Sequence, residues 1–170
     1  RPFNSSKRYV IFETNEGDTP RIVVSAFGAS WTSPLRGSIP VAWSVDPVLA
    51  ERFPALLDYF AATATPNDSF IGGVAGAGYV YLGALSDAQL QKYASRVGRL
   101  FSEYGPSVAD AYGQANLTTI EKYTKYAAMG GDAPSAYVSQ PLWAHGSYGQ
   151  DAFKCPRLNF RANDGTPIIC

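Results

Sequence analysis

The sequence of 170 residues has no long hydrophobic run and no net charge. Its longest apolar stretches, such as Arg21 to Phe27, are far shorter than the roughly 18 residues that a membrane-spanning helix needs. The N-terminus also carries no hydrophobic leader, so we expect no membrane association, in a chain that is either matured or cut from something longer. Because 14 basic residues are scattered among 14 acidic ones, no basic face is available for phosphates, and we expect no nucleic-acid partner.

Histidine is almost absent, because His145 is the only one. A histidine-based zinc site is therefore disfavoured, and we expect neither a metal nor a cofactor. A Ser-His-Asp hydrolase would depend on His145, yet no G-x-S-x-G motif occurs in the chain. A hard cation held by Glu16, Asp18 and backbone carbonyls is the one metal site that the sequence leaves open.

Cysteine is also scarce, with one pair near the C-terminus, Cys155 and Cys170. If the two form a disulfide, the closed loop of about 16 residues would stabilise the domain by roughly 3 kcal/mol. The glycosylation pattern N-x-S/T occurs at Asn4, Asn67 and Asn116. Together these features predict a secreted glycoprotein, although chance sequons and two free thiols of a cytosolic protein would give the same pattern.

The remaining composition, 46% hydrophobic, is enough for one well-filled core, so we expect residues 1–170 to form a single domain. Hydrophobic patterning and turn residues predict alternating strands and helices. Asp46 and Pro47 are typical of a helix start, and Pro54 predicts a break in the helix that follows. The expected strands are 9–13, 39–45, 69–74, a weak 107–112, 136–139, 158–161 and 166–170; the expected helices follow Pro47 and cover 87–104 and 118–128. Ser86 and Gln89 predict a near capping box at the start of the helix 87–104, whose inward face includes Tyr93. In the helix 118–128 we expect Ile120, Tyr123 and Ala127 to face inward.

This alternation predicts an α/β fold of βα repeats with a parallel sheet and right-handed crossovers. A complete eightfold barrel usually takes about 250 residues. We therefore expect either a smaller open sheet or a TIM-barrel-like piece that is completed by the rest of a longer polypeptide.

The segment from Gly72 to Leu85 contains five glycines and two tyrosines between a strand and a helix. The dinucleotide fingerprint G-x-G-x-x-G matches at Gly76 and Gly78 but fails at Tyr81, which argues against a nucleotide-binding domain. No lysine follows these glycines, which excludes a P-loop. The structural alternative is that the glycines only allow the chain to turn at positive φ. This alternative explains one or two glycines better than it explains all five.

The residues Gly76-Ala-Gly-Tyr-Val-Tyr81 resemble the signature of the GxGYxYP family. Further stretches, Glu16 to Thr19, Arg36 to Pro47 and Thr65 to Phe70, are similar to motifs of that family in the same order, so that the match covers roughly residues 7–104. The resemblance implies a glycoside hydrolase whose main domain is a TIM-type barrel. The chain departs from the family pattern at Leu82, where the signature ends in proline, and at Glu16 and Thr19 in the acidic loop, which weakens the case for retained activity.

Glycoside hydrolysis needs two carboxyl groups across a cleft, and in parallel α/β folds the carboxyl ends of strands are the place to find them. The expected catalytic residues are Glu16, Asp18 and Asp110; the expected substrate-binding residues are Asp46, Gly76, Gly78, Tyr79, Tyr81, Trp143 and His145. Each residue also has a structural explanation: Asp46 as a helix N-cap, Glu16 and Asp18 as turn residues, and Trp143 as packing beneath a loop. Burial of Asp110 beside Tyr112 would favour it as the acid.

The sequence therefore predicts an extracellular, carbohydrate-active domain that binds a carbohydrate ligand and the remainder of its polypeptide or other extracellular subunits. The alternative is a non-catalytic secreted glycoprotein module for carbohydrate binding or assembly. In either case the bare backbone from Gly72 to Gly78 is expected to pass close under the ligand, with Tyr79 and Tyr81 at the cleft.

Overall fold

The structure is a computed structural model that describes residues 6, 10–14, 20–111, 117–139, 159–161 and 167–169. No helix in these ranges is long and apolar enough to span a bilayer. The helical elements are α1 (Pro20–Ile22), the π-helical turn η1 (Val23–Phe27), α2 (Gly28–Trp31), α3 (Val48–Arg52), α4 (Pro54–Thr63), the 3-10 turn η2 (Leu82–Ala84), α5 (Asp87–Tyr104) and α6 (Leu117–Gly130). The strands are β1 (Val41–Val45), β2 (Asp68–Val74), β3 (Val108–Ala111), β4 (Ala136–Ser139), β5 (Asn159–Arg161) and β6 (Pro167–Ile169).

The strands form one six-stranded sheet in the order β1-β2-β3-β4-β6-β5. All neighbours are parallel except β5, which runs antiparallel to β6. The α/β fold with parallel βα repeats is thus confirmed. Among the described residues the sheet is open, with β5 at one end, so no closed barrel is formed. The strand expected at 9–13 is reduced to a single parallel bridge between Glu13 and Ala42 of β1.

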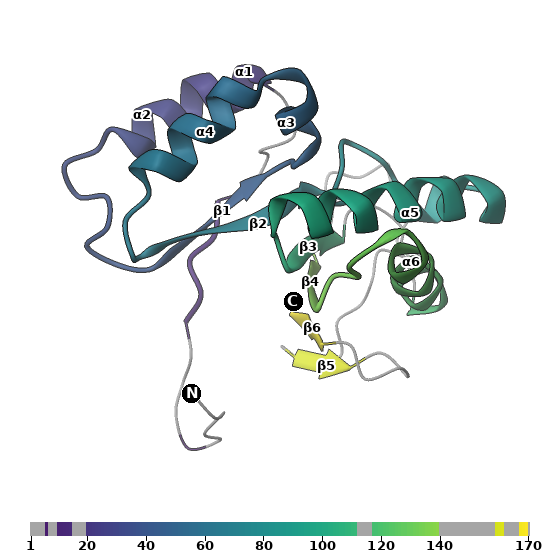
Figure 1. Cartoon of the computed structure of the whole chain (residues 1–170). Coiled ribbons are helices and arrows are strands. Elements are labelled where there is room, and N and C mark those ends of the chain that lie inside the picture. Colours follow the sequence, from purple (N-terminus) through teal and green to yellow (C-terminus); the bar gives the residue numbers. More distant parts are fainter. Residues whose placement is uncertain are drawn as a thin grey trace, which may run out of the picture.

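All the connecting helices between β1 and β4 cover the same face of the sheet. Strand order follows chain order from β1 to β4, and right-handed crossovers then place successive helices on one side. Trp43 packs against α2 and α4, and Tyr137 of β4 packs against Tyr123 of α6. Figure 1 shows α2 beside α4 over β1, and α5 beside α6. The opposite face of the sheet therefore carries the alternate residues of each strand.

The predicted helices end where their capping residues indicate. Ser86 and Gln89 form a full capping box at the start of α5, and Gly105 closes the helix in the left-handed conformation. The expected break at Pro54 separates α3 from α4. In α6 the three residues expected to face inward, Ile120, Tyr123 and Ala127, are all buried.

Residues 20–31 form a helix that the sequence patterning did not predict. Val23, Phe27 and Trp31 are spaced four residues apart and are all buried, so that one stripe of this helix packs on the sheet. The Trp31 ring lies 5.0 Å from the Trp43 ring and 4.7 Å from the Phe60 ring, both edge-on. This aromatic cluster is the core beneath α2 and α4.

Helices α5 and α6 touch along their backbones. A methyl group added at Gly98 of α5 would overlap the carbonyl of Ala127, and one at Gly130 of α6 would overlap the carbonyl of Ser95. The backbone N–H of Asp132 donates to the Gly98 carbonyl at 3.0 Å. Only residues without side chains permit so close an approach.

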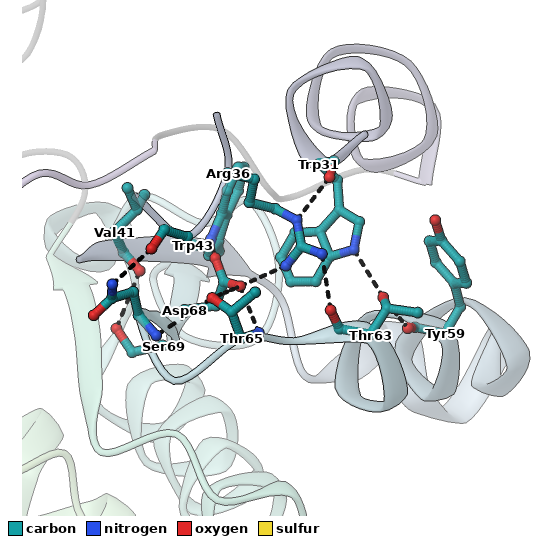
Figure 2. A network of polar contacts seen from close by, with 11 residues as sticks. Trp31, Arg36, Val41, Trp43, Tyr59, Thr63, Thr65, Asp68 and Ser69 are labelled. Atoms are coloured by element: carbon teal, nitrogen blue, oxygen red, sulfur yellow. Dashed lines mark hydrogen bonds and ion pairs between the residues drawn. The ribbon is translucent and has the colours of Figure 1, made fainter. Parts of the chain in front are cut away.

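A network of polar contacts joins the amino-terminal ends of β1 and β2 to α2 and α4 (Figure 2). Its centre is the ion pair of Arg36 with Asp68, at 2.5 Å between Nη1 and Oδ2. Arg36 also donates to the carbonyls of Trp31 and Thr63, and its guanidinium lies 4.3 Å from the centre of the Trp31 ring. We call this set the Arg36–Asp68 network; it consists of Trp31, Arg36, Trp43, Thr63, Thr65 and Asp68.

Asp68 is fully satisfied within this network. Its carboxylate accepts hydrogen bonds from the backbone N–H and hydroxyl of Thr65 and from the indole of Trp43. Burial contributes most to the pKa of Asp68 and raises it, but the hydrogen bonds from Thr65 and Trp43 and the charge of Arg36 together outweigh burial, so the pKa lies below its usual value. The network thus holds an ionised carboxylate at the amino-terminal edge of the sheet.

Candidate functional site

Two buried carboxyl groups and a tyrosine pair gather at the carboxyl-terminal ends of β1, β2 and β3. Asp46 directly follows β1 and has no exposed surface, and Asp110 lies in β3 with 1% exposed. The loop of residues 75–78 and the tyrosines Tyr79 and Tyr81 follow β2. The structure therefore brings together three segments that the sequence analysis selected separately, at the edge where parallel α/β folds place their sites.

Asp110 is hydrogen-bonded on both its backbone and its side chain. The Ser44 hydroxyl of β1 donates to Oδ2 of Asp110 at 2.9 Å, although β2 lies between the two strands. The Asp110 carbonyl accepts from the backbone N–H of Ala75 at 3.1 Å. Asp110 is therefore tied to both neighbouring segments of the site. Tyr112, which was expected beside it, lies outside the described residues.

Asp46 is not a helix N-cap through its side chain. The N-cap of α3 is Pro47, and no side-chain capping bond is formed there. Instead the carboxyl group points towards the loop after β2, where Oδ2 would lie 3.9 Å from a methyl group on Gly78. Burial, and secondarily the negative charge of Asp46, raises the pKa of Tyr93. The structural alternative for Asp46 is thus wrong, and its side chain belongs to the candidate site.

Two tyrosine hydroxyls, one from α5 and one from α6, bind the backbone of the loop of residues 75–78. The Tyr93 hydroxyl of α5 lies 3.1 Å from the Ala75 carbonyl and 2.9 Å from the Gly78 carbonyl, and it accepts from the Ala77 N–H. The Tyr123 hydroxyl of α6 donates to the Ala75 carbonyl at 2.7 Å. Because both hydroxyls are bonded to backbone, the helices fix the loop directly.

Gly76 and Gly78 both have positive φ, at 90° and 119°, but they face different surroundings. A methyl group on Gly76 would lie 2.7 Å from the Tyr123 hydroxyl and 3.0 Å from Val97. Packing against the helices therefore accounts for Gly76 without a ligand. Gly72 likewise makes room for the ring of Phe101. Of these three glycines, Gly78 is the one that faces the carboxyl group of Asp46, so packing against the helices does not account for it.

This difference between the glycines can be tested by a double-mutant cycle. We expect Gly76→Ala to lower the free energy of unfolding by roughly 3 kcal/mol, because backbone strain and overlap with the Tyr123 hydroxyl add together. In the Tyr123→Phe background the overlap is removed, so the same substitution should cost about 1 kcal/mol less. Urea denaturation of the four proteins measures both values. Gly78→Ala in the same two backgrounds is the control and should be additive; equal coupling at both glycines would contradict the assignment.

Tyr79 and Tyr81 form an aromatic pair at the surface. Their rings lie 5.7 Å apart in an edge-to-face arrangement, and their hydroxyls are 3.4 Å apart. Tyr79 is 51% exposed. Beyond Tyr81, a hollow of about 290 Å³ opens between η2 and the first turns of α5 and α6, with Thr118, Thr119 and Lys122 in its wall. Neither tyrosine lines this hollow. An exposed aromatic face suits the flat apolar surface of a ligand, and a polar hollow suits hydroxyl groups.

A second hollow, of about 260 Å³, has a different character. Its lining is mostly apolar and comes from β1, α4 and the segment that follows α5, including Val45, Phe60 and Pro106. It opens on the face of the sheet that the helices cover. Neither Asp46 nor Asp110 lines it, so it is separate from the carboxyl groups.

The remaining predicted site residues cannot be placed, because they lie outside the described residues. These are Glu16, Asp18, Trp143, His145, Cys155, Cys170, Asn4 and Asn116. Within the described ranges no group of three or more histidine, cysteine or acidic side chains could hold a metal ion. Asn67 is described: it is partly buried, and its amide nitrogen donates to the Gly37 carbonyl at 2.7 Å.

Comparison with known proteins identifies the family. Residues 6–152 match the family described as "GxGYxYP putative glycoside hydrolase C-terminal domain". The chain belongs to the GxGYxYP family. Its fold is similar to that of a protein described as a putative hydrolase from Bacteroides thetaiotaomicron, with a TM-score of 0.73 and 19% sequence identity over 94% of this chain. The chain spans 29% of the length of that protein. A search of curated protein sequences gives no match.

For this GxGYxYP domain, the structure adds site residues that the sequence analysis did not name. Ser44 binds Asp110, and Tyr93 and Tyr123 hold the loop that the signature glycines form. Tyr93 and Tyr123 were predicted only as inward-facing helix residues. The hydroxyl groups of these two tyrosines could have revealed the role from the sequence. A buried tyrosine needs a hydrogen-bond partner, and a glycine-rich loop supplies backbone carbonyls.

Proposed function

We propose that this domain provides a carbohydrate site with glycoside hydrolase chemistry at the carboxyl-terminal ends of β1, β2 and β3. The observation that carries the proposal is the convergence of Asp46, Asp110 and the exposed tyrosine pair at this one edge. Sugar rings stack on aromatic faces, and their hydroxyl groups bind carboxylates and polar side chains. The family description and the hydrolase-like neighbour support the same class.

Hydrolysis of a glycosidic bond requires one carboxyl group that is protonated and one that is ionised. Asp110 is our candidate for one of them. Asp46, Glu16 or Asp18 supplies the other. Their separation decides the stereochemical outcome: about 5 to 5.5 Å between carboxyl groups accompanies retention, and about 6.5 to 9.5 Å accompanies inversion.

We further propose that the sheet is an arc of a TIM-type barrel completed by other parts of a longer polypeptide. Two features support this: strand order follows chain order from β1 to β4, and the intervening helices cover one face. In such a barrel the other face points inwards, which would direct Ser44 and Asp110 towards the interior near its catalytic end. The short span relative to the Bacteroides protein is consistent with this arrangement.

The test is the release of reducing ends from a panel of polysaccharides, combined with oligosaccharide binding. We expect Asp110→Asn to lower the rate by about 10²- to 10⁴-fold without loss of folding. Tyr79→Ala should weaken binding roughly tenfold, through loss of the stacking surface. Tyr59→Ala is a matched control, because Tyr59 lies on α4 with a similar exposure of 47% and away from the site.

One observation favours a second candidate, a non-catalytic carbohydrate-binding module. Asp46 and Asp110 are almost fully buried, whereas Tyr79 is exposed, so that the stacking surface is accessible without the carboxyl groups. A module of this kind would bind oligosaccharides, lose binding in Tyr79→Ala and release no reducing ends. Activity that survives in Asp110→Asn would contradict the catalytic assignment of this residue, and absence of both activity and binding would contradict both candidates.

We also propose that the domain is extracellular, which rests on the sequons at Asn4 and Asn116 and on the cysteine pair. The partners proposed with it are the remainder of the same polypeptide or other extracellular subunits. A mass shift on deglycosylation of the protein from its native host is the expected result. An unmodified protein would leave this proposal without support.

A further inference from the structure

Ser44 and Asp110 form a buried hydrogen bond that spans a whole strand. They belong to β1 and β3, which are separated by β2, yet their Oγ and Oδ2 atoms are 2.9 Å apart. Ser44 has no exposed surface and Asp110 has 1%. Gly72 faces the helices, where it meets Phe101, and the register of β2 against β3 shifts between Gly72 and Val74. Gly73, the residue between them, contributes no side chain to this part of β2.

The backbone of Ser44 is held by the segment that runs beside β1. The N–H of Ala42 donates to the Phe12 carbonyl, and the N–H of Thr14 donates to the Ala42 carbonyl. At the next step the Ser44 N–H donates to the side-chain hydroxyl of Thr14, at 3.0 Å. The position of Ser44 is therefore fixed from one side by Thr14, while its own hydroxyl remains directed at Asp110.

A hydroxyl that donates to a carboxyl group favours the ionised form of that group. Burial works in the opposite direction and favours the neutral acid. Around Asp110 the described structure supplies both effects, and the substitution Ser44→Ala removes the hydrogen bond from Ser44. The direction of the bond also fixes one carboxyl oxygen in space, as a reacting group requires.

We propose that Ser44 is a positioning residue that keeps Asp110 ionised and orients its carboxylate for the glycoside hydrolase chemistry proposed above. The inference rests on that proposed function. It assigns Asp110 the role of the ionised member of the pair, contrary to the expectation that burial makes it the acid. Asp110 then either bonds to the anomeric carbon, giving a glycosyl ester that water later hydrolyses, or takes a proton from a water molecule whose oxygen bonds to that carbon. In both cases the glycosidic C–O bond breaks, and the second carboxyl group gives its proton to the departing oxygen.

The closing experiment measures the Asp110 carboxyl directly by ¹³C NMR as a function of pH, in protein labelled at aspartate. We expect Ser44→Ala to raise the midpoint of the Asp110 titration by about one pKa unit, because one hydrogen bond to the charged form is lost. Ser44→Thr keeps a hydroxyl and should restore the native midpoint. Ser69→Ala is the matched control: it removes an exposed hydroxyl on β2 that binds the Val41 carbonyl, and it should leave the midpoint unchanged.

None of these substitutions changes an ionisable group of the candidate site or of the segments that pack on it. Those described are Glu13 beside β1, whose pKa is raised by burial, Asp46 after β1, and Tyr93 and Tyr123 on the helices. A difference between Ser44→Ala and Ser69→Ala therefore reports the Ser44 bond. An unchanged midpoint in Ser44→Ala would overturn the proposal.

The outcome can be separated from that of the proposed function. If the midpoint moves as expected and Ser44→Ala also lowers kcat more than KM, both the positioning role and the hydrolase proposal are supported. If the midpoint moves while the native protein releases no reducing ends, the proposed function fails and the positioning role of Ser44 in it fails as well, although the effect of the hydrogen bond on Asp110 is established. Recovery of kcat in Ser44→Thr distinguishes positioning from a purely structural contribution.

Discussion

Replacing Gly98 with alanine is expected to lower the free energy of unfolding by about 3 kcal/mol. The added methyl group would overlap the carbonyl of Ala127, and a backbone atom inside a helix cannot move aside as a flexible side chain can. Helices α5 and α6 would have to separate, although Leu100 and Phe101 of α5 are buried in the core that these helices share. Urea denaturation followed by circular dichroism measures the loss as a shift of the midpoint.

Gly28→Ala is the matched control for this substitution. Gly28 is also helical, but a methyl group there would meet only the Val23 carbonyl, at 3.8 Å. Because alanine favours helix over glycine, we expect this variant to be unchanged or more stable by about 0.5 to 1 kcal/mol. A Gly98→Ala protein as stable as Gly28→Ala would show that the two helices are not in backbone contact.

Asp68→Asn is expected to lower the free energy of unfolding by about 3 kcal/mol at neutral pH. The substitution leaves the charge of Arg36, which is largely buried, without its partner, and it weakens the hydrogen bonds from Thr65 and Trp43. Thermal or urea unfolding measures the loss. Asp58→Asn on the exposed surface of α4 is the control, and we expect it to change stability by less than about 0.5 kcal/mol.

The effect of Asp68→Asn should depend on pH in a defined direction. The pKa of Asp68 in the folded chain lies below its value of about 3.9 in an unfolded chain. Its contribution is therefore complete above about pH 4 and is lost as the pH falls through the lower, folded pKa. Native protein and Asp68→Asn should converge in stability under acid conditions. A difference that stays constant down to about pH 2 would contradict an ionised Asp68.

The sequence predicts most of the fold because its local signals and its tertiary packing agree. The capping box at Ser86, the break at Pro54 and the apolar face of α6 each have one physical explanation, and each is found in the structure. The alternation of these helices with short apolar strands was enough to predict a parallel sheet. Their order along the chain also predicted which ends of the strands would gather the polar residues.

Two kinds of feature could not be predicted in this way. The helix at residues 20–31 is short of capping signals, and its spacing of Val23, Phe27 and Trp31 becomes evident only when their burial is known. Ser44 gave no signal either, since a serine inside a strand has no distinctive pattern and its partner is 66 positions away. A contact that crosses a neighbouring strand depends on the register of the strands and on the size of the residue in the strand between them. Neither can be read from the composition of the sequence.

The Arg36–Asp68 network lies at the amino-terminal ends of β1 and β2, whereas the two buried carboxyl groups lie at or beyond the opposite ends. Arg36, Trp43, Thr65 and Asp68 are also residues of the stretches by which the chain resembles its family. The stretches that reveal the kinship thus contain scaffold residues as well as Ser44 and Asp46 of the candidate site. Asp110 lies outside all of them, so a relative can match every stretch and still lack this carboxyl group.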